Sequence, residues 1–176
     1  PDLFLGGRLG QAKPVCFSTV MGYLGLSGVY SPLTGEANYN RLLPDSGRVF
    51  AIAHEKAHQR GIASENEANF VAFLALRSSP DRYLRYCGYL NAAGYALGAI
   101  AGSEPDTYPD LAALLRGRPA VDAMRDTAFW RRYRGPVERV STRVNDLYLR
   151  ANRVPGGIRS YDAVTDLLIG FWRQEQ

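Results

Sequence analysis

The sequence predicts a mainly α-helical fold of one domain, with a small β element at its N-terminal side. The length supports one domain, because 176 residues can bury a core without help from a disulfide. The pattern then changes near residue 46: segment 1–46 is rich in Gly, Pro, Ser and Asn, whereas apolar residues recur every three or four positions in 47–176. We therefore expect a loop- and strand-rich segment 1–46 followed by helices up to residue 176.

Breakers and capping residues divide the helical part into separate helices. Two short apolar pieces, 14–17 and 27–30, predict strands before it. Gly61 suits the left-handed position after a helix, and Ser64 with Glu67 has the spacing of a capping box. The predicted helices are 47–60, 65–78, 81–101, 107–116, 120–133, 136–152 and 161–174.

Composition excludes several classes of protein. The formal net charge is +4, and the densest basic cluster, at 131–134, is typical of a solvated helix face, so we expect no nucleic-acid partner. Cys16 and Cys87 are too far apart for a paired-cysteine zinc site, and the sequence leaves their redox state open. No apolar run reaches the roughly eighteen residues that a membrane span needs.

The residues that carry chemistry form an HExxH motif at 54–58. On a helix, His54 and His58 lie one turn apart on the same face, so both imidazoles can reach one Zn²⁺. Glu55 then lies beside the zinc-bound water and can act as its general base. The alternative is two surface histidines that happen to flank a glutamate. It is disfavoured because the chain has only these two histidines.

A catalytic zinc usually has three protein ligands and one open position. The chain has no third histidine and no cysteine close to the motif, so the third ligand should be a carboxylate. Glu65 and Glu67 both follow the turn at Gly61 closely enough to be candidates. The residues alone leave both open, although the capping role already explains Glu67.

The run HEKAHQRGIASENEANF resembles the signature of an uncharacterised bacterial family of predicted membrane-anchored zinc peptidases of the HExxH-plus-glutamate, or gluzincin, type. The runs KPVCFSTVMGYLGLSGVYSPLTGEANYN and GGIRSYDAVTDLL also resemble that family. The resemblance implies a zincin-like helical catalytic domain outside the cytoplasmic membrane, anchored by segments that are not in this sequence. Lys56 departs from the apolar residue that many relatives carry.

The same resemblance favours Glu65 as the third ligand. In gluzincins, an Asp or Asn one helical turn after the ligand Glu commonly holds a metal-bound histidine through its second ring nitrogen. Asn69 follows Glu65 with this spacing, whereas Glu67 is followed by Val71, which offers no such hydrogen bond.

Two further groups of residues are candidates for substrate contact. Gluzincins place an edge strand beside the motif helix, and segment 34–40, with Glu36 and Asn38, could be that strand; the alternative is a Gly-Asn loop. Tyr161 or Arg159 could stabilise the oxyanion of the reaction, although such residues are more often packed or on the surface.

We therefore expect a zinc metallopeptidase that hydrolyses peptide bonds of a peptide or protein substrate through a zinc-bound water activated by Glu55. One alternative is a zinc-binding sensor or interaction domain without turnover. Another, favoured only by the arginine excess, is a nucleic-acid-binding helical domain.

Overall fold

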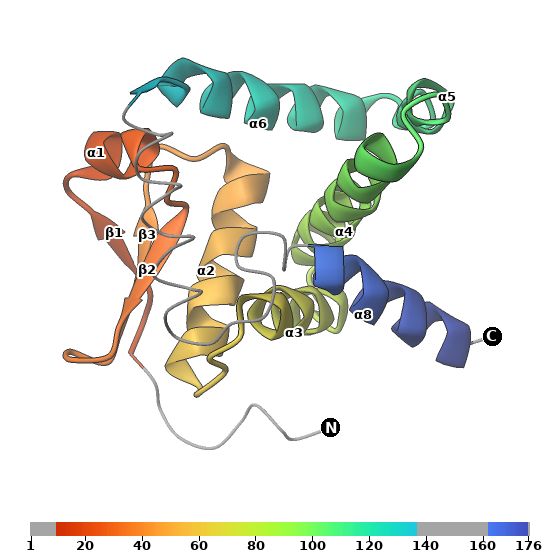
Figure 1. Ribbon diagram of the computed structural model, residues 1–176. Coiled ribbons are helices and arrows are strands. Elements are labelled where there is room, and N and C mark those ends of the chain that lie inside the picture. The colour runs from red at the N-terminus through yellow and green to blue at the C-terminus, as the bar shows by residue number, and fades with distance from the viewer. Residues whose placement is uncertain (1–9, 137–161, 176) are drawn as a thin grey trace.

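A computed structural model describes residues 10–136 and 162–175 and has the predicted mainly helical fold with a small N-terminal sheet (Figure 1). The strands are β1 (Lys13–Val15), β2 (Gly28–Ser31) and β3 (Glu36–Asn40), and α1 (Ser18–Tyr23) lies between β1 and β2. The later helices are α2 (Asp45–Gln59), α3 (Glu65–Arg77), α4 (Arg82–Ser103), α5 (Tyr108–Ala112), α6 (Arg118–Tyr133) and α8 (Asp162–Gln174).

The predicted helices within the described residues are all present, and most ends agree within two residues. The exception is α5, which ends at Ala112 rather than 116, and the predicted helix 136–152 lies outside the described residues apart from its first position. The sequence does not predict α1, because six residues containing Gly22 and β-branched side chains show no helical period. Among the described residues, no helix is both long and apolar enough to cross a membrane.

The sheet has the strand order β1-β3-β2, which corrects the prediction for segment 34–40. Part of that segment does form a strand, β3, but it is the central strand and not an edge. It pairs in parallel with β1 on one side and antiparallel with β2 on the other, so both of its edges are occupied. The free edge beside the motif helix belongs to β2.

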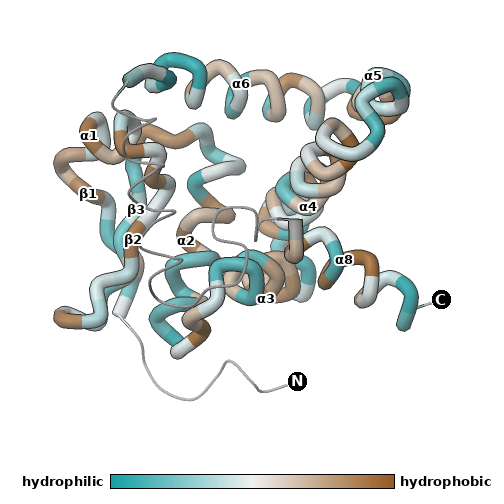
Figure 2. The backbone as a smooth tube through the Cα atoms, in the orientation of Figure 1, coloured by the Kyte–Doolittle hydropathy of each residue, from teal (hydrophilic) through white to brown (hydrophobic). Residues whose placement is uncertain are grey.

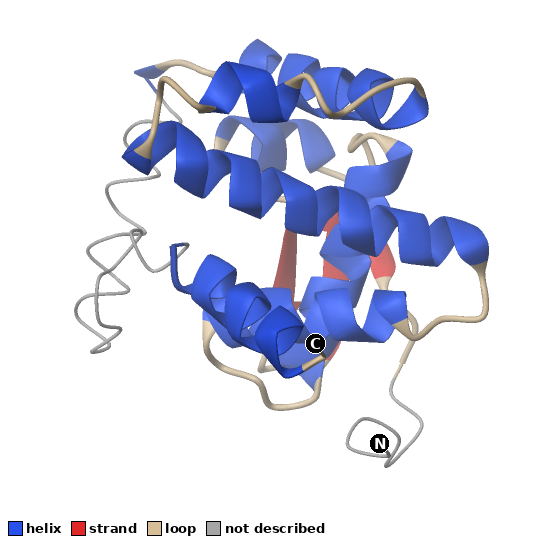
Figure 3. Ribbon diagram, turned by 90° about the vertical axis from the view of Figure 1, so that its right-hand side faces the viewer, coloured by secondary structure: helices blue, strands red, loops and turns tan. Residues whose placement is uncertain are grey.

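Helix α2 lies at the centre of the fold, between the sheet on one side and α3 and α4 on the other (Figures 1 and 3). Its small residues allow this close packing, since Ala51 and Ala57 are each 3% exposed. Phe50 joins α2 to the core formed with α3 and α8, in which Phe73 is 1% exposed. The HExxH motif therefore lies inside the protein rather than on its surface.

Helix α8 closes the other side of the core with an amphipathic face. Helix α8 contacts α3 and α4, and Figure 2 shows hydrophobic residues along it; two residues of α8, Val164 and Leu168, are buried. The guanidinium of Arg77 on α3 lies 4.9 Å from the centre of the Phe171 ring and also pairs with Glu175 at 2.7 Å. These contacts hold the last described helix against α3, the helix that follows the motif.

The buried side chain of Asp122 on α6 joins α6 to α4 through a cluster of hydrogen bonds whose arginine partners are exposed. Its Oδ2 accepts bonds from the Tyr86 hydroxyl at 2.9 Å and from the Arg118 guanidinium at 2.6 Å, and Arg125 lies 3.5 Å from Oδ1. Burial alone would raise the pKa of Asp122, but these hydrogen bonds and cations outweigh it and lower the pKa. The carboxylate is therefore ionised and fully engaged.

We predict that Asp122→Asn lowers the free energy of unfolding by about 1–2 kcal/mol, because it removes the buried anion to which Tyr86 and the exposed Arg118 donate. Urea denaturation measures the change. Asp106→Asn, at an exposed position, is the matched control and should change stability little. Equal effects of the two variants would contradict the prediction.

Candidate metal centre

The turn after α2 is a Schellman motif, and it reverses the chain within a few residues. Gly61 has φ +93°, the left-handed conformation that glycine adopts without strain. Its N–H donates to the His58 carbonyl at 2.9 Å, and the Ile62 N–H donates to the Ala57 carbonyl at 3.2 Å. The predicted role of Gly61 is confirmed, and the chain after it runs back toward the motif.

Helix α3 begins immediately after this turn. The Ser64 hydroxyl accepts a hydrogen bond from the Glu67 N–H, as predicted for the cap, at 3.5 Å. Glu65 is therefore the first residue of α3 and projects back toward α2, whereas the Glu67 side chain is exposed. Between the two candidate carboxylates, the structure brings Glu65 to the histidines.

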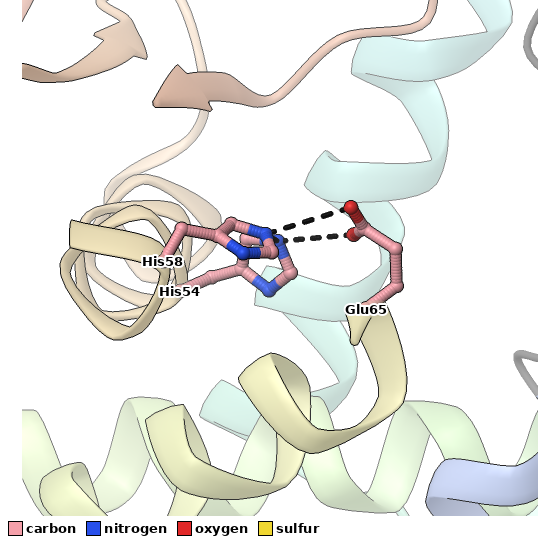
Figure 4. Close-up of side chains that lie close together, drawn as sticks. All are labelled: His54, His58 and Glu65. Carbon is pink, nitrogen blue, oxygen red and sulfur yellow. Dashed lines mark hydrogen bonds and ion pairs between the residues drawn. The ribbon is translucent and has the colours of Figure 1, made fainter. Parts of the chain in front are cut away.

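His54, His58 and Glu65 point toward one another from α2 and α3 (Figure 4). The Nε2 atoms of His54 and His58 lie 3.0 Å apart. The two Glu65 oxygens lie 3.2 Å from His54 Nε2 and 3.5 Å from His58 Nε2. These three side chains form a group that could hold a metal ion.

The spacing of this donor set is compatible with a small metal ion. Ligands bound about 2.05 Å from a tetrahedral Zn²⁺ are separated by roughly 3.3 Å from one another. The two Nε2 atoms lie 3.0 Å apart, and each has a different Glu65 oxygen at 3.2 or 3.5 Å. One donor atom from each of the three residues lies within 4.8 Å of the other two. Two imidazoles and one carboxylate are also donor types that zinc accepts.

A backbone carbonyl fixes the orientation of His58. His58 Nδ1 lies 2.7 Å from the Ile62 oxygen, and because a carbonyl can only accept, Nδ1 must carry the proton. A neutral His58 ring therefore directs the Nε2 lone pair toward Glu65 and His54. Sequence reasoning missed Ile62, although its position directly after the Gly61 turn could have indicated it.

Asn69 does not take the predicted role in this arrangement. It is buried at 4% exposure, but His58 uses the Ile62 carbonyl instead, and the buried Nδ1 of His54 has no hydrogen-bond partner. Asn69 was predicted to hold a histidine through its second ring nitrogen. For His58, the Ile62 carbonyl in the tight turn already fills this role.

The ligand candidates stabilise one another electrostatically. Burial would raise the pKa of Glu65, but hydrogen bonds with His54 and His58 outweigh it and lower the pKa to about 2. Burial also disfavours protonated His58, and the hydrogen bonds with Glu65 and with the Ile62 carbonyl overcome this and raise its pKa. Glu65 is thus an anion at neutral pH, as a metal ligand must be.

Glu55 lies on the sheet side of α2, next to this group. It is 4% exposed, and burial raises its pKa to about 7, although the two histidines and the backbone of Tyr30 partly lower it. A carboxylate whose pKa lies near neutrality can both accept and release a proton at working pH. This property fits the general base that the motif predicts.

The remaining motif residues tie α2 to the N-terminal segment. The Lys56 ammonium donates to the Gly10 carbonyl and to Gln59 Oε1, both at 2.7 Å. The Gln59 amide in turn donates to the Gly35 carbonyl, in the β2–β3 turn, at 2.6 Å. Lys56 therefore acts as an anchor and not as part of the metal group.

The structure does not bring the other predicted substrate residues to the metal group. Glu36 pairs with Lys13, and Asn38 donates to the Glu36 carbonyl. Since side chains alternate along a strand, Glu36 and Asn38 lie on the sheet face opposite the one that Ala37 presents to α2. Tyr161 and Arg159 lie outside the described residues.

We predict that metal-free protein loses stability as the pH rises from about 5 to about 8. Folded Glu55 titrates near 7 instead of its unfolded value of 4.5, so ionising it in the folded state costs up to about 3 kcal/mol. His58 adds to the fall, because its raised pKa stabilises the fold only while it is protonated. Glu65, with its pKa lowered to about 2, contributes equally across this range.

Chemical denaturation of chelator-treated protein across this pH range measures the effect. Glu55→Gln should flatten most of the slope, since glutamine does not titrate. An unchanged slope in that variant would show that Glu55 is not the group responsible.

We also predict that Glu65→Ala weakens zinc binding by more than the 10–100-fold typical of a residue that only supports a ligand. Glu67→Ala is the matched control and should leave zinc affinity nearly unchanged, because its side chain is exposed. Titration with a competing zinc indicator measures both. A larger loss for Glu67→Ala would contradict the assignment of Glu65.

No curated protein and no solved structure matches this chain. One family profile, described as "Protein of unknown function (DUF3810)", matches residues 3–169. Since that match covers nearly the whole sequence, the chain belongs to the DUF3810 family.

Proposed function

We propose that this protein is a zinc-dependent metallopeptidase. The observation that carries the proposal is the position of buried Glu55 immediately beside a three-residue donor set that could hold a metal ion. Structural zinc sites usually have four protein ligands, whereas three protein ligands and an adjacent carboxylate are typical of hydrolytic sites.

His54, His58 and Glu65 would hold the ion. Bound zinc supplies Lewis-acid chemistry, polarising a carbonyl and lowering the pKa of a water molecule. Glu55 accepts the proton of the attacking water and passes it to the leaving amine, and its pKa of about 7 suits both steps. The Ile62 carbonyl holds His58 in the tautomer that binding requires.

The free edge of β2 is the best place for an extended substrate. Asn40 donates its N–H to the Ser27 carbonyl, so by the alternation of an antiparallel ladder Gly28 and Tyr30 direct their backbone groups away from β3. The Tyr30 backbone N–H already bonds to Glu55, which places this edge beside the proposed base and leaves the Gly28 groups and the Tyr30 carbonyl for a peptide. A peptide added to β2 as a further strand would run past Glu55.

Two measurements test the proposal. Metal analysis of protein purified without chelators should give one zinc per chain, and a peptide-library assay should detect cleavage that a chelator abolishes and zinc restores. Absence of zinc after titration would contradict the metal site. Stable zinc binding without any cleavage would favour the alternative, a zinc-binding sensor or interaction domain.

We predict that Glu55→Gln keeps zinc but lowers kcat by about 10²-fold or more, because an amide of similar volume cannot accept a proton. Cleavage of a library-derived peptide and zinc content are measured on the same preparation. Glu67→Gln is the control for removing a carboxylate and should retain the wild-type rate. Near wild-type cleavage by Glu55→Gln would exclude Glu55 as the base.

A further inference from the structure

Gly28, the first residue of β2, is in direct contact with Glu55. It is buried, and it faces α2. A Cβ atom added to Gly28 would lie 2.5 Å from both Cγ and Oε1 of Glu55, and 2.8 Å from its Cδ. These distances are far below van der Waals contact, so the Glu55 side chain occupies the space that any other residue at position 28 would need.

This contact distinguishes Gly28 from the other described glycines. An added Cβ would meet the Tyr133 ring at Gly22 and the Leu76 side chain at Gly88, which are packing contacts between elements. At Gly94 and Gly98 it would meet nothing within 4 Å. Among the described glycines, Gly28 alone makes room for a residue of the proposed catalytic group.

The contact involves the chemically important end of the side chain. It includes Cγ, Cδ and one carboxylate oxygen of Glu55, so a methyl group at position 28 would displace the carboxylate itself. Glu55 has little freedom to adjust, since it is 4% exposed and lies close to His54, His58 and Glu65. Strand β2 therefore limits where the Glu55 carboxylate can lie.

We propose that Gly28 is a positioning residue for the reaction: by having no side chain, it allows the Glu55 carboxylate to lie against the strand edge that receives the peptide. This inference rests on the proposed function. One strand then sets both the path of the substrate and the place of the base, so the two are held in register. Displacement of a reacting group by about 1 Å can cost about 10²-fold in rate.

A role in packing alone would make a different prediction. If Gly28 only lets α2 approach the sheet, Gly28→Ala should destabilise the protein by the same amount whatever residue stands at position 55. If Glu55 occupies the space, shortening it should remove the effect. The two explanations can therefore be separated without any substrate.

The first experiment is a double-mutant cycle on thermal stability. Gly28→Ala should lower Tm by about 5 °C in the wild-type background, as expected for overpacking in a protein of this size. In a Glu55→Ala background, Gly28→Ala should change Tm very little, because removing the Glu55 side chain leaves room for the new methyl group. The double variant also provides a folded protein if Gly28→Ala alone is unstable.

The second experiment measures catalysis with a peptide selected from the library. Gly28→Ala should lower kcat by about 10²-fold, change KM little, and lose much less zinc affinity than the roughly 10-fold that marks damage to a partner of a ligand. Gly94→Ala, on the open face of α4, is the matched control and should keep the wild-type kcat.

Equal Tm changes in the two backgrounds would overturn the inference, and so would wild-type kcat in folded Gly28→Ala. Failure of the proposed function gives a distinct result: wild-type protein would bind no zinc or cleave no peptide. In that case the cycle still reports whether Gly28 and Glu55 are in contact, but the positioning role is overturned together with the function.

Discussion

The turn at Gly61 is the constraint on which the site depends. Two hydrogen bonds, from Gly61 to His58 and from Ile62 to Ala57, close the end of α2 and reverse the chain. Because of this turn, the Ile62 carbonyl lies beside His58 Nδ1 and the Glu65 carboxylate lies beside His58 Nε2. A longer or looser connection would place Glu65 elsewhere, so the candidate metal group follows from the local geometry of one left-handed residue.

The surroundings of α2 explain how so many polar groups remain buried. Each imidazole has a carboxylate within reach, and Glu65 gains from both rings what it loses in hydration. The histidines and the Tyr30 backbone compensate Glu55 only partly for its lost hydration, so its pKa is raised to about 7. When Glu55 and Glu65 are both ionised, this group carries two negative charges side by side, which a divalent cation would balance. The fold tolerates this imbalance because α2 is held on opposite sides by the sheet and by α3 and α4.

The sequence predicted what depends on neighbouring residues. Helix α2 and the cap at Ser64 follow from spacings of a few positions. Those spacings left Glu65 and Glu67 both open, and only the family resemblance favoured Glu65. The sequence could not predict the central place of β3, since parallel pairing with β1 depends on how the chain crosses between distant segments. The contact of the Ile62 carbonyl with His58 was not predicted, because a pattern of side chains does not show where backbone groups lie. Gly28 resembles any loop glycine until the packing of α2 on β2 is known.

The bond from Gln59 to the Gly35 carbonyl has a consequence for how such proteins can diverge. Because Gln59 bonds to a backbone oxygen, this contact does not depend on which side chains the rest of the β2–β3 turn carries. Leu33, in that turn, is 99% exposed. The tip can therefore accept new residues while the motif helix keeps its hold on the hairpin. Relatives could therefore differ in the side chains of this turn and keep its contact with α2.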